Sequence, residues 1–126
     1  MRNKEKLNNM KNSEFQILRG DVVYAETSIV DEHIQCGRRP YMIISNNFCN
    51  RFADVVIGIP FTTAIKKKNL PTHYTFYWNK RYNTAMCEQP TLIHKDRIVG
   101  YVSTLADKHI KEIEERVKIQ LDLKGE

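Results

Sequence analysis

The chain has 126 residues, 41% of them hydrophobic, which fits one domain with a single core and leaves no room for two. Its net charge of +5 and pI near 9.2 suit a polyanionic partner without proving one. No apolar run approaches the roughly 18–20 residues of a membrane-spanning helix, and residues 1–18 lack the apolar core of a signal peptide, so we expect a cytoplasmic protein.

Residues 1–18 are rich in Lys and Asn and have little to bury, so we predict a flexible tail before one domain over residues 19–123. Met10 is an alternative translation start. The β-branched and aromatic run 22–27 predicts the first strand. Residues 28–38 carry charges and no sustained apolar period, which indicates a loop. Its eleven residues are many for a hairpin connection and favour a functional role.

Two continuous apolar runs come next, at residues 41–44 and 55–59. Both predict strands that are buried on two faces. Pro40 would stand at the first position of the earlier strand, where its missing N–H is tolerated. Between the two runs, residues 48–52 predict a single helical turn.

The C-terminal half predicts three more strands and a helix. Residues 73–78 alternate in the way typical of a strand open to solvent on one side, and residues 84–87 and 98–102 complete six strands. Over residues 106–121 the apolar side chains recur at helical spacing with charges between them. Six short strands and one packing helix predict a mainly β fold: a small, strongly bent antiparallel barrel or half-barrel whose strand pairing stays open.

Cysteine and histidine spacing indicates no metal site. Cys36, Cys49 and Cys87 are odd in number and far apart, with no CxxC pair, so we expect reduced thiols. The four histidines also lack a metal-ligand pattern. We therefore expect neither a metal nor an organic cofactor.

Five short motifs resemble the MazF/PemK family of toxin endoribonucleases in their order and near spacing. They are Arg19-Gly20-Asp21-Val22, Gly37-Arg38-Arg39-Pro40, Asn50-Arg51-Phe52, Leu70-Pro71-Thr72-His73 and Glu88-Gln89. The resemblance covers about residues 19–123 and implies an SH3-like (CcdB/PemK-like) barrel with a C-terminal amphipathic helix, assembled as a homodimer.

The same resemblance implies the toxin of a type II toxin–antitoxin pair. Such a toxin is a sequence-specific, metal-independent endoribonuclease that cuts single-stranded mRNA, at sites containing ACA or UACAU in the members closest in these motifs. Its implied partners are a cognate MazE-like antitoxin, whose acidic tail would block the RNA groove, and operator DNA only together with that antitoxin.

Metal-free RNA cleavage needs help with deprotonating the ribose 2′-hydroxyl, neutralising charge on the phosphate and protonating the leaving 5′-oxygen. The products would be a 2′,3′-cyclic phosphate and a 5′-hydroxyl. Arg39 matches the family's catalytic Arg before Pro and would stabilise the phosphorane charge, although an arginine here can also brace a loop through a carboxylate. Thr62 matches a catalytic Thr or Ser. Strand-end threonines also cap local backbone, and Thr63 would replace Thr62 if the register slips by one.

His33 and Glu88 are the candidates for the base, and the resemblance supports both. Glu88 has an alternative role in holding Arg39, and Gln89 can read a base edge. Further RNA contacts are expected from cations and amides in predicted loops, namely Gln35, Arg38, Thr63, Lys66, Lys67 and Lys68. The lysine run also reads as an ordinary solvated turn. Among the aromatic residues, Trp78 and Tyr82 are candidates for stacking on bases.

Three departures from the family pattern favour the arrangement of Arg39 with Thr62 and leave the preferred base sequence open. Ile34 replaces an acidic residue, Met86 replaces an arginine that acts as the acid in some PemK members, and Thr91-Leu92 replaces an Arg-Thr pair. Two other functions belong to the same fold: a CcdB-like toxin that binds gyrase without nuclease activity, and an inactive module that represses its operon with the antitoxin.

Overall fold

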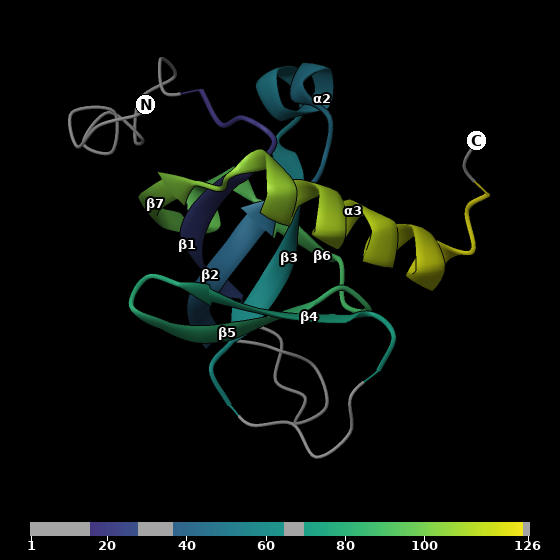
Figure 1. Ribbon diagram of the computed structural model, residues 1–126. Coiled ribbons are helices and arrows are strands. Elements are labelled where there is room, and N and C mark those ends of the chain that lie inside the picture. The colour runs from purple at the N-terminus through teal and green to yellow at the C-terminus, as the bar shows by residue number, and fades with distance from the viewer. Residues whose placement is uncertain (1–15, 28–36, 65–69, 125–126) are drawn as a thin grey trace.

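The computed structural model describes residues 16–27, 37–64 and 70–124 of the chain. They form one antiparallel sheet of seven strands with a long helix across one side (Figure 1). The elements in chain order are β1 Asp21–Thr27, β2 Gly37–Ile43, α2 Asn47–Phe52, β3 Val55–Thr62, β4 His73–Trp78, β5 Arg81–Met86, β6 Thr91–His94, the 3-10 turn η2 Lys95–Arg97, β7 Ile98–Thr104 and α3 Asp107–Leu121.

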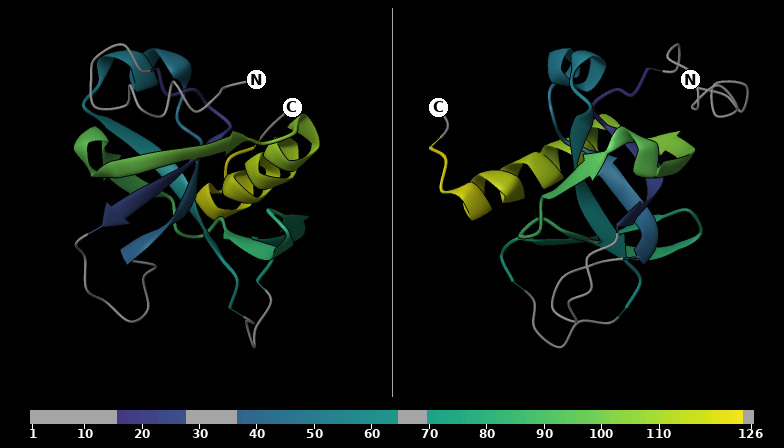
Figure 2. Two further views of the ribbon diagram at one scale, coloured as in Figure 1. Left: turned by 90° about the vertical axis from the view of Figure 1, so that its left-hand side faces the viewer. Right: turned by 180° about the vertical axis from the view of Figure 1, so that it is seen from behind.

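Strand β3 is the centre of the sheet because it changes partners along its length. Residues 55–58 pair with β6, residues 58–60 with β2, and residues 61–62 with β5. The resulting order is β4-β5-β3-β2-β1-β7, with β6 on the other half of β3, and the sheet curves strongly around this strand (Figure 2). A mainly β fold with a C-terminal helix is confirmed. The sheet is not closed, however, so "barrel" describes it only loosely.

The two faces of the sheet carry separate apolar clusters. The first includes Val22, Met42, Phe61 and Ile113, and α3 covers it. The second lies on the opposite face and includes Tyr41 and other residues of β1, β2, β6 and β7. Because side chains alternate across a strand, β2 contributes to both clusters and is buried on both faces, as predicted. In β3 that prediction holds only in part, since Ile57 is exposed.

Helix α3 docks on the first motif of the chain. Gly20 has a φ of +90°, and a Cβ there would lie 2.6 Å from Cδ1 of Ile110 in α3. Only glycine combines this backbone conformation with so close an approach. The neighbouring Arg19 forms an ion pair with Glu114 of the same helix. The Arg19-Gly20 motif is therefore a joint between the sheet and α3.

Two strand starts and one missed strand are the main differences from the sequence prediction. Strand β2 begins at Gly37, not 41, because it pairs with β1 as far as Thr27. Pro40 is thus inside a strand, but it lies beyond the last β2–β3 pair, Tyr41 with Pro60, where a missing donor removes no bond to β3. Strand β5 begins at Arg81 because a two-residue turn follows β4. The four-residue strand β6 was not predicted at all; the helical turn at α2 and the terminal helix are confirmed.

None of the described helices is long and apolar enough to cross a membrane.

Candidate active site

Arg39 and Thr62 lie on the same face of the sheet. The last paired residues of β2 and β3 are Tyr41 and Pro60, and Arg39 and Thr62 each lie two residues beyond that pair, so alternation gives them the face of Tyr41 and Pro60. Thr62 pairs with Thr84 of β5, which pairs with Thr75 of β4. Directly opposed residues share a face of the sheet, so the three threonines form one row across β3, β5 and β4. We call the face that carries Thr62, Thr75 and Thr84 the threonine face.

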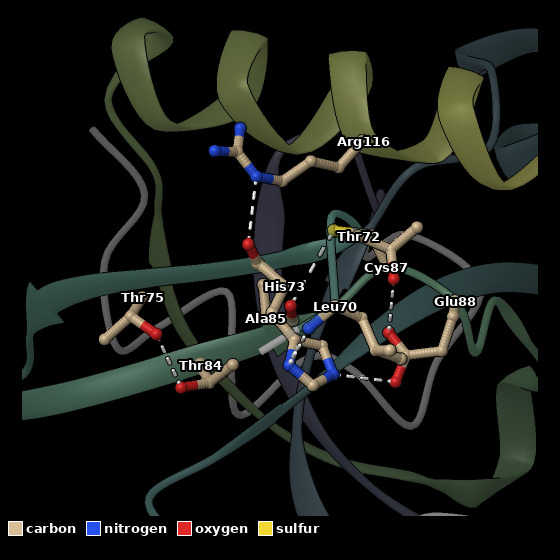
Figure 3. Close-up of polar contacts among 9 residues, drawn as sticks. All are labelled: Leu70, Thr72, His73, Thr75, Thr84, Ala85, Cys87, Glu88 and Arg116. Carbon is tan, nitrogen blue, oxygen red and sulfur yellow. Dashed lines mark hydrogen bonds and ion pairs between the residues drawn. The ribbon is translucent and has the colours of Figure 1, made fainter. Parts of the chain in front are cut away.

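The threonine face is the side of the sheet that points away from α3. The alternate residues Phe61, Phe76 and Ala85 belong to the cluster beneath that helix. Across the threonine face the hydroxyls of Thr75 and Thr84 are 2.9 Å apart and hydrogen-bonded (Figure 3). The row lies at the edge of the second apolar cluster, beside the start of β2 and the end of β3. Rigid strands commonly present polar groups at such positions.

Arg38 and Arg39 have opposite orientations because they are neighbours in β2. Arg39 is partly exposed and lies opposite Ala25 of β1. Arg38 is exposed on the other side, and its Nε and Nη2 donate to Oε1 of Glu26 at 3.0 and 2.8 Å. Bracing by a carboxylate is thus seen in Arg38, and for Arg39 it stays an alternative. Register directs Arg39 to the threonine face.

Thr62 is the last residue of β3, and only 8% of its surface is exposed. Its Oγ1 accepts a hydrogen bond from the backbone N–H of Ala64 at 3.1 Å. A hydroxyl that accepts one bond still has its proton to donate, so backbone capping leaves Thr62 able to bind an oxygen atom. Thr63 lies beyond the strand and is exposed. Register therefore selects Thr62 for the row.

Glu88 is anchored by two side chains of the Leu70-Pro71-Thr72-His73 motif (Figure 3). Thr72 Oγ1 donates to Glu88 Oε1 at 3.1 Å, and His73 Nε2 lies 3.0 Å from Oε2. The N–H of Leu70 approaches His73 Nδ1 at 3.4 Å. An Nδ1 that accepts leaves the proton on Nε2, so His73 donates to the carboxylate. Their side chains are only 6% and 17% exposed, for His73 and Glu88 respectively.

Alternation in β4 puts His73 on the threonine face with Thr75, so Glu88 is held at the edge of that face. Helix α3 supports the pair from behind: Arg116 Nε donates to the carbonyl of His73 at 3.0 Å, and its guanidinium lies over the Tyr74 ring, 4.9 Å from the centroid. The Glu88 position is thus fixed by groups from β4 and α3 together.

Cys87 is not a nucleophile candidate. It is fully buried, and desolvation raises the pKa of its thiol to about 12. Near neutral pH the thiolate, which is the reactive form, is therefore almost absent. Within the described ranges, no three His, Cys, Asp or Glu side chains gather as metal ligands would.

Of the residues predicted for the site, Arg39 and Thr62 lie on the threonine face by alternation, and Glu88 is hydrogen-bonded to His73 of the same face. Gln89 follows Glu88 in a turn in which its N–H donates to the carbonyl of Met86 at 3.0 Å. His33, Gln35, Lys66, Lys67 and Lys68 lie outside the described residues. No role was predicted from the sequence for His73 and Thr72. The one feature of the sequence that pointed to their contact with Glu88 was that their motif and Glu88-Gln89 occur together.

The stacking prediction is corrected for Trp78. Its ring packs edge-on against Phe61, with centroids 5.5 Å apart, in the cluster beneath α3. Alternation therefore turns Trp78 away from the threonine face. Tyr82 is exposed, and it lies opposite Tyr77.

Comparisons with known proteins agree with this architecture. A family model described as a PemK-like, MazF-like toxin of type II toxin–antitoxin systems matches residues 18–121. Endoribonuclease EndoA of Bacillus subtilis is 33% identical over 111 residues, 85% of this chain and 96% of the relative. Endoribonuclease MazF of Staphylococcus saprophyticus is 33% identical over 109 residues, 83% of this chain and 91% of the relative.

Solved structures show the same fold. MazF from Deinococcus radiodurans superposes with a TM-score of 0.75 at 16% identity, covering 87% of this chain and 100% of that one. A mycobacterial endoribonuclease solved with its cognate antitoxin has a TM-score of 0.71 at 21% identity, covering 87% and 99%.

Fold and relatives together define the class of this protein as a toxin endoribonuclease, an RNA-cleaving enzyme. Within that class, the chain belongs to the PemK-like, MazF-like toxins of type II toxin–antitoxin systems.

Proposed function

We propose that this toxin cleaves single-stranded RNA at a short recognition sequence, without a metal ion, by attack of the RNA's own 2′-hydroxyl. The observation that carries the proposal is the alternation that gives Arg39 and Thr62 the same face of the sheet, with Glu88 hydrogen-bonded to Thr72 and His73 beside it. RNA supplies the nucleophile, so the protein's task is largely to position the chain and stabilise charge.

Each residue then has a defined role. The 2′-oxygen attacks the phosphorus as its proton passes to the Glu88 carboxylate, and the bond from phosphorus to the 5′-oxygen breaks. Arg39 stabilises the charge of the pentavalent intermediate, because a guanidinium keeps its charge and can bind two phosphate oxygens. Thr62 donates to a non-bridging oxygen. The 5′-oxygen takes a proton from solvent, leaving a 2′,3′-cyclic phosphate and a 5′-hydroxyl. His33 is the alternative proton acceptor.

Affinity for RNA is assigned to the residues flanking this row. The net charge of +5 supports an electrostatic contribution from Arg38, Lys66, Lys67 and Lys68. Gln35, Thr63 and Gln89 are the proposed readers of the bases. A target containing ACA, such as UACAU, is the sequence to test first.

The proposal extends to the partners of this chain. A cognate MazE-like antitoxin with an acidic segment would compete with RNA for the basic site. A mycobacterial endoribonuclease of the same fold is solved in complex with its cognate antitoxin. We propose a homodimer in the cytoplasm, which binds operator DNA only together with the antitoxin. Exposed Ile57 and Leu92, opposite each other on β3 and β6, provide apolar surface that suits contact between copies.

The experiment is to incubate the purified toxin with one long RNA in the presence of EDTA and to map the new ends. We expect cuts at one short sequence, with 2′,3′-cyclic phosphate and 5′-hydroxyl termini. Intact RNA after prolonged incubation would refute the proposal. Gyrase activity measured alongside tests the CcdB-like alternative, which the endoribonuclease relatives do not favour: it predicts inhibited gyrase and intact RNA.

A further inference from the structure

An exposed aromatic pair shares the threonine face with Thr62. Tyr77 of β4 and Tyr82 of β5 lie directly opposite each other and are 60% and 67% exposed. Their rings meet edge to face, with centroids 5.2 Å apart at 77°. This geometry leaves a ring face of the pair open to solvent.

Register connects this pair to the proposed reaction site. Tyr82 precedes Thr84 by two residues, and Tyr77 follows Thr75 by two, so the tyrosines form the next row along the same face. Two residues of a strand span about 7 Å, and Thr84 pairs directly with Thr62. A phosphate bound at Thr62 would therefore have its neighbouring nucleotides within reach of the two rings.

The pair is held on a rigid support. The β4–β5 hairpin closes through Asn79 and Lys80, whose φ values of 53° and 69° match the two-residue turn that suits the twist of a hairpin. The side chain of Asn83 donates to the carbonyls of Trp78 and Arg81 at 2.8 and 3.1 Å, which ties the strands together beside the turn. Because the pair is already ordered before RNA binds, stacking of bases on it does not have to order any protein segment.

The charge of the hairpin suits a nucleic acid strand. Residues 73–86 contain no Asp or Glu, while Lys80 and Arg81 are exposed at the tip, which projects from the body of the sheet (Figure 1). Cations with adjacent open aromatic rings are the usual elements of single-strand binding surfaces. An acidic peptide would match the positive charge, but it has no bases that stack on the tyrosine rings.

We propose that Tyr77 and Tyr82 form a stacking subsite for the bases that flank the cut phosphate. The subsite rests on the RNA cleavage proposed above and adds a binding element that the reaction itself does not require. It contributes to substrate binding, and the chemical step remains with Arg39, Thr62 and Glu88.

The test compares two RNAs that contain the mapped cut site: a minimal one, and one extended by flanking nucleotides on both sides. For the wild type we expect a lower KM on the extended RNA. Replacing both rings in Tyr77→Leu/Tyr82→Leu should raise KM for the extended RNA about fivefold or more, leave kcat within about twofold, and leave the minimal RNA unaffected. The matched control Tyr77→Phe/Tyr82→Phe keeps the rings and should behave as the wild type.

Each result supports or overturns the stacking subsite. Equal KM for the extended RNA in the leucine variant and the wild type would overturn the subsite while leaving the nuclease intact. A loss of similar size on both RNAs would show that the tyrosines act through the fold of the hairpin, which also overturns it. If the wild type leaves even the long RNA intact, so that no cut site can be mapped, the proposed function and the subsite are refuted together.

Discussion

The hydrogen bond from His73 to Glu88 offers a sharp test of the site. His73 Nε2 is 3.0 Å from the Glu88 carboxylate, and both side chains are mostly buried. This bond fixes the position of the carboxylate, and a misplacement of about 1 Å can slow an enzyme about 100-fold. If Glu88 accepts the 2′-proton, losing this donor should therefore slow cleavage roughly 10- to 100-fold.

Two substitutions separate the two ring nitrogens of His73. Gln is long enough to place an amide N–H where Nε2 lies, whereas Asn reaches only as far as Nδ1. His73→Gln should therefore retain kcat within about threefold, because it still donates to Glu88. His73→Asn keeps the contact with Leu70 and should show the full loss. Single-turnover cleavage of one RNA, with thermal melts of each variant, provides the measurement.

A double-mutant cycle shows whether His73 acts through Glu88. In the Glu88→Gln background, His73→Asn should cost less than about twofold, because the group it positions is already gone. Equal rates for His73→Asn and His73→Gln would refute the positioning role. An undiminished effect in the Glu88→Gln background would refute it as well.

Three further predictions follow from burial and register. Thr62→Ala should lower kcat about tenfold or more, and Thr63→Ala should change it little because Thr63 lies beyond the row; equal losses would contradict the register. Tyr41→Phe should keep or raise the melting temperature, since the fully buried Tyr41 hydroxyl has no hydrogen-bond partner in the part of the chain that the structure describes; a marked fall would show an unseen partner. Burial lowers the pKa of His109, whose Nδ1 is hydrogen-bonded to the Tyr74 hydroxyl at 2.8 Å. The unfolded state therefore takes up a proton before the folded state as pH drops through about 6.5, so thermal melts should show stability falling there, and His109→Gln should lose that contribution.

Much of the fold was predictable because it is encoded locally. The apolar runs gave the positions of the longer strands, and helical spacing gave α3. Non-local pairing decided the rest. Residues 37–40 form a strand only because β1 lies beside them, and a four-residue strand such as β6 is too short for a reliable period. Nothing in the sequence showed that β3 pairs with β6, β2 and β5 in turn along its length.

The candidate site was predictable in its members and not in its geometry. Arg39 and Thr62 came from a family resemblance, and alternation gives them one face of the sheet, which Arg38 does not share. The hydrogen bond between His73 and Glu88 could not be predicted, because His73 is fifteen residues away, at the start of β4. The orientation of Trp78 was equally hidden, since only the tight β4–β5 turn settles which alternate residues face α3.

The central claim is that the guanidinium of Arg39 stabilises the charge that develops during attack by the 2′-hydroxyl. Its most direct test is the single-turnover rate constant of Arg39→Ala against that of Arg38→Ala, measured at saturating RNA with EDTA present. The neighbours match in charge and differ in the face they occupy, so we predict a loss of roughly 100-fold or more for Arg39→Ala and less than about threefold for Arg38→Ala. Equal rate constants for the two variants, or an Arg39→Ala variant that cleaves like the wild type, would contradict the account.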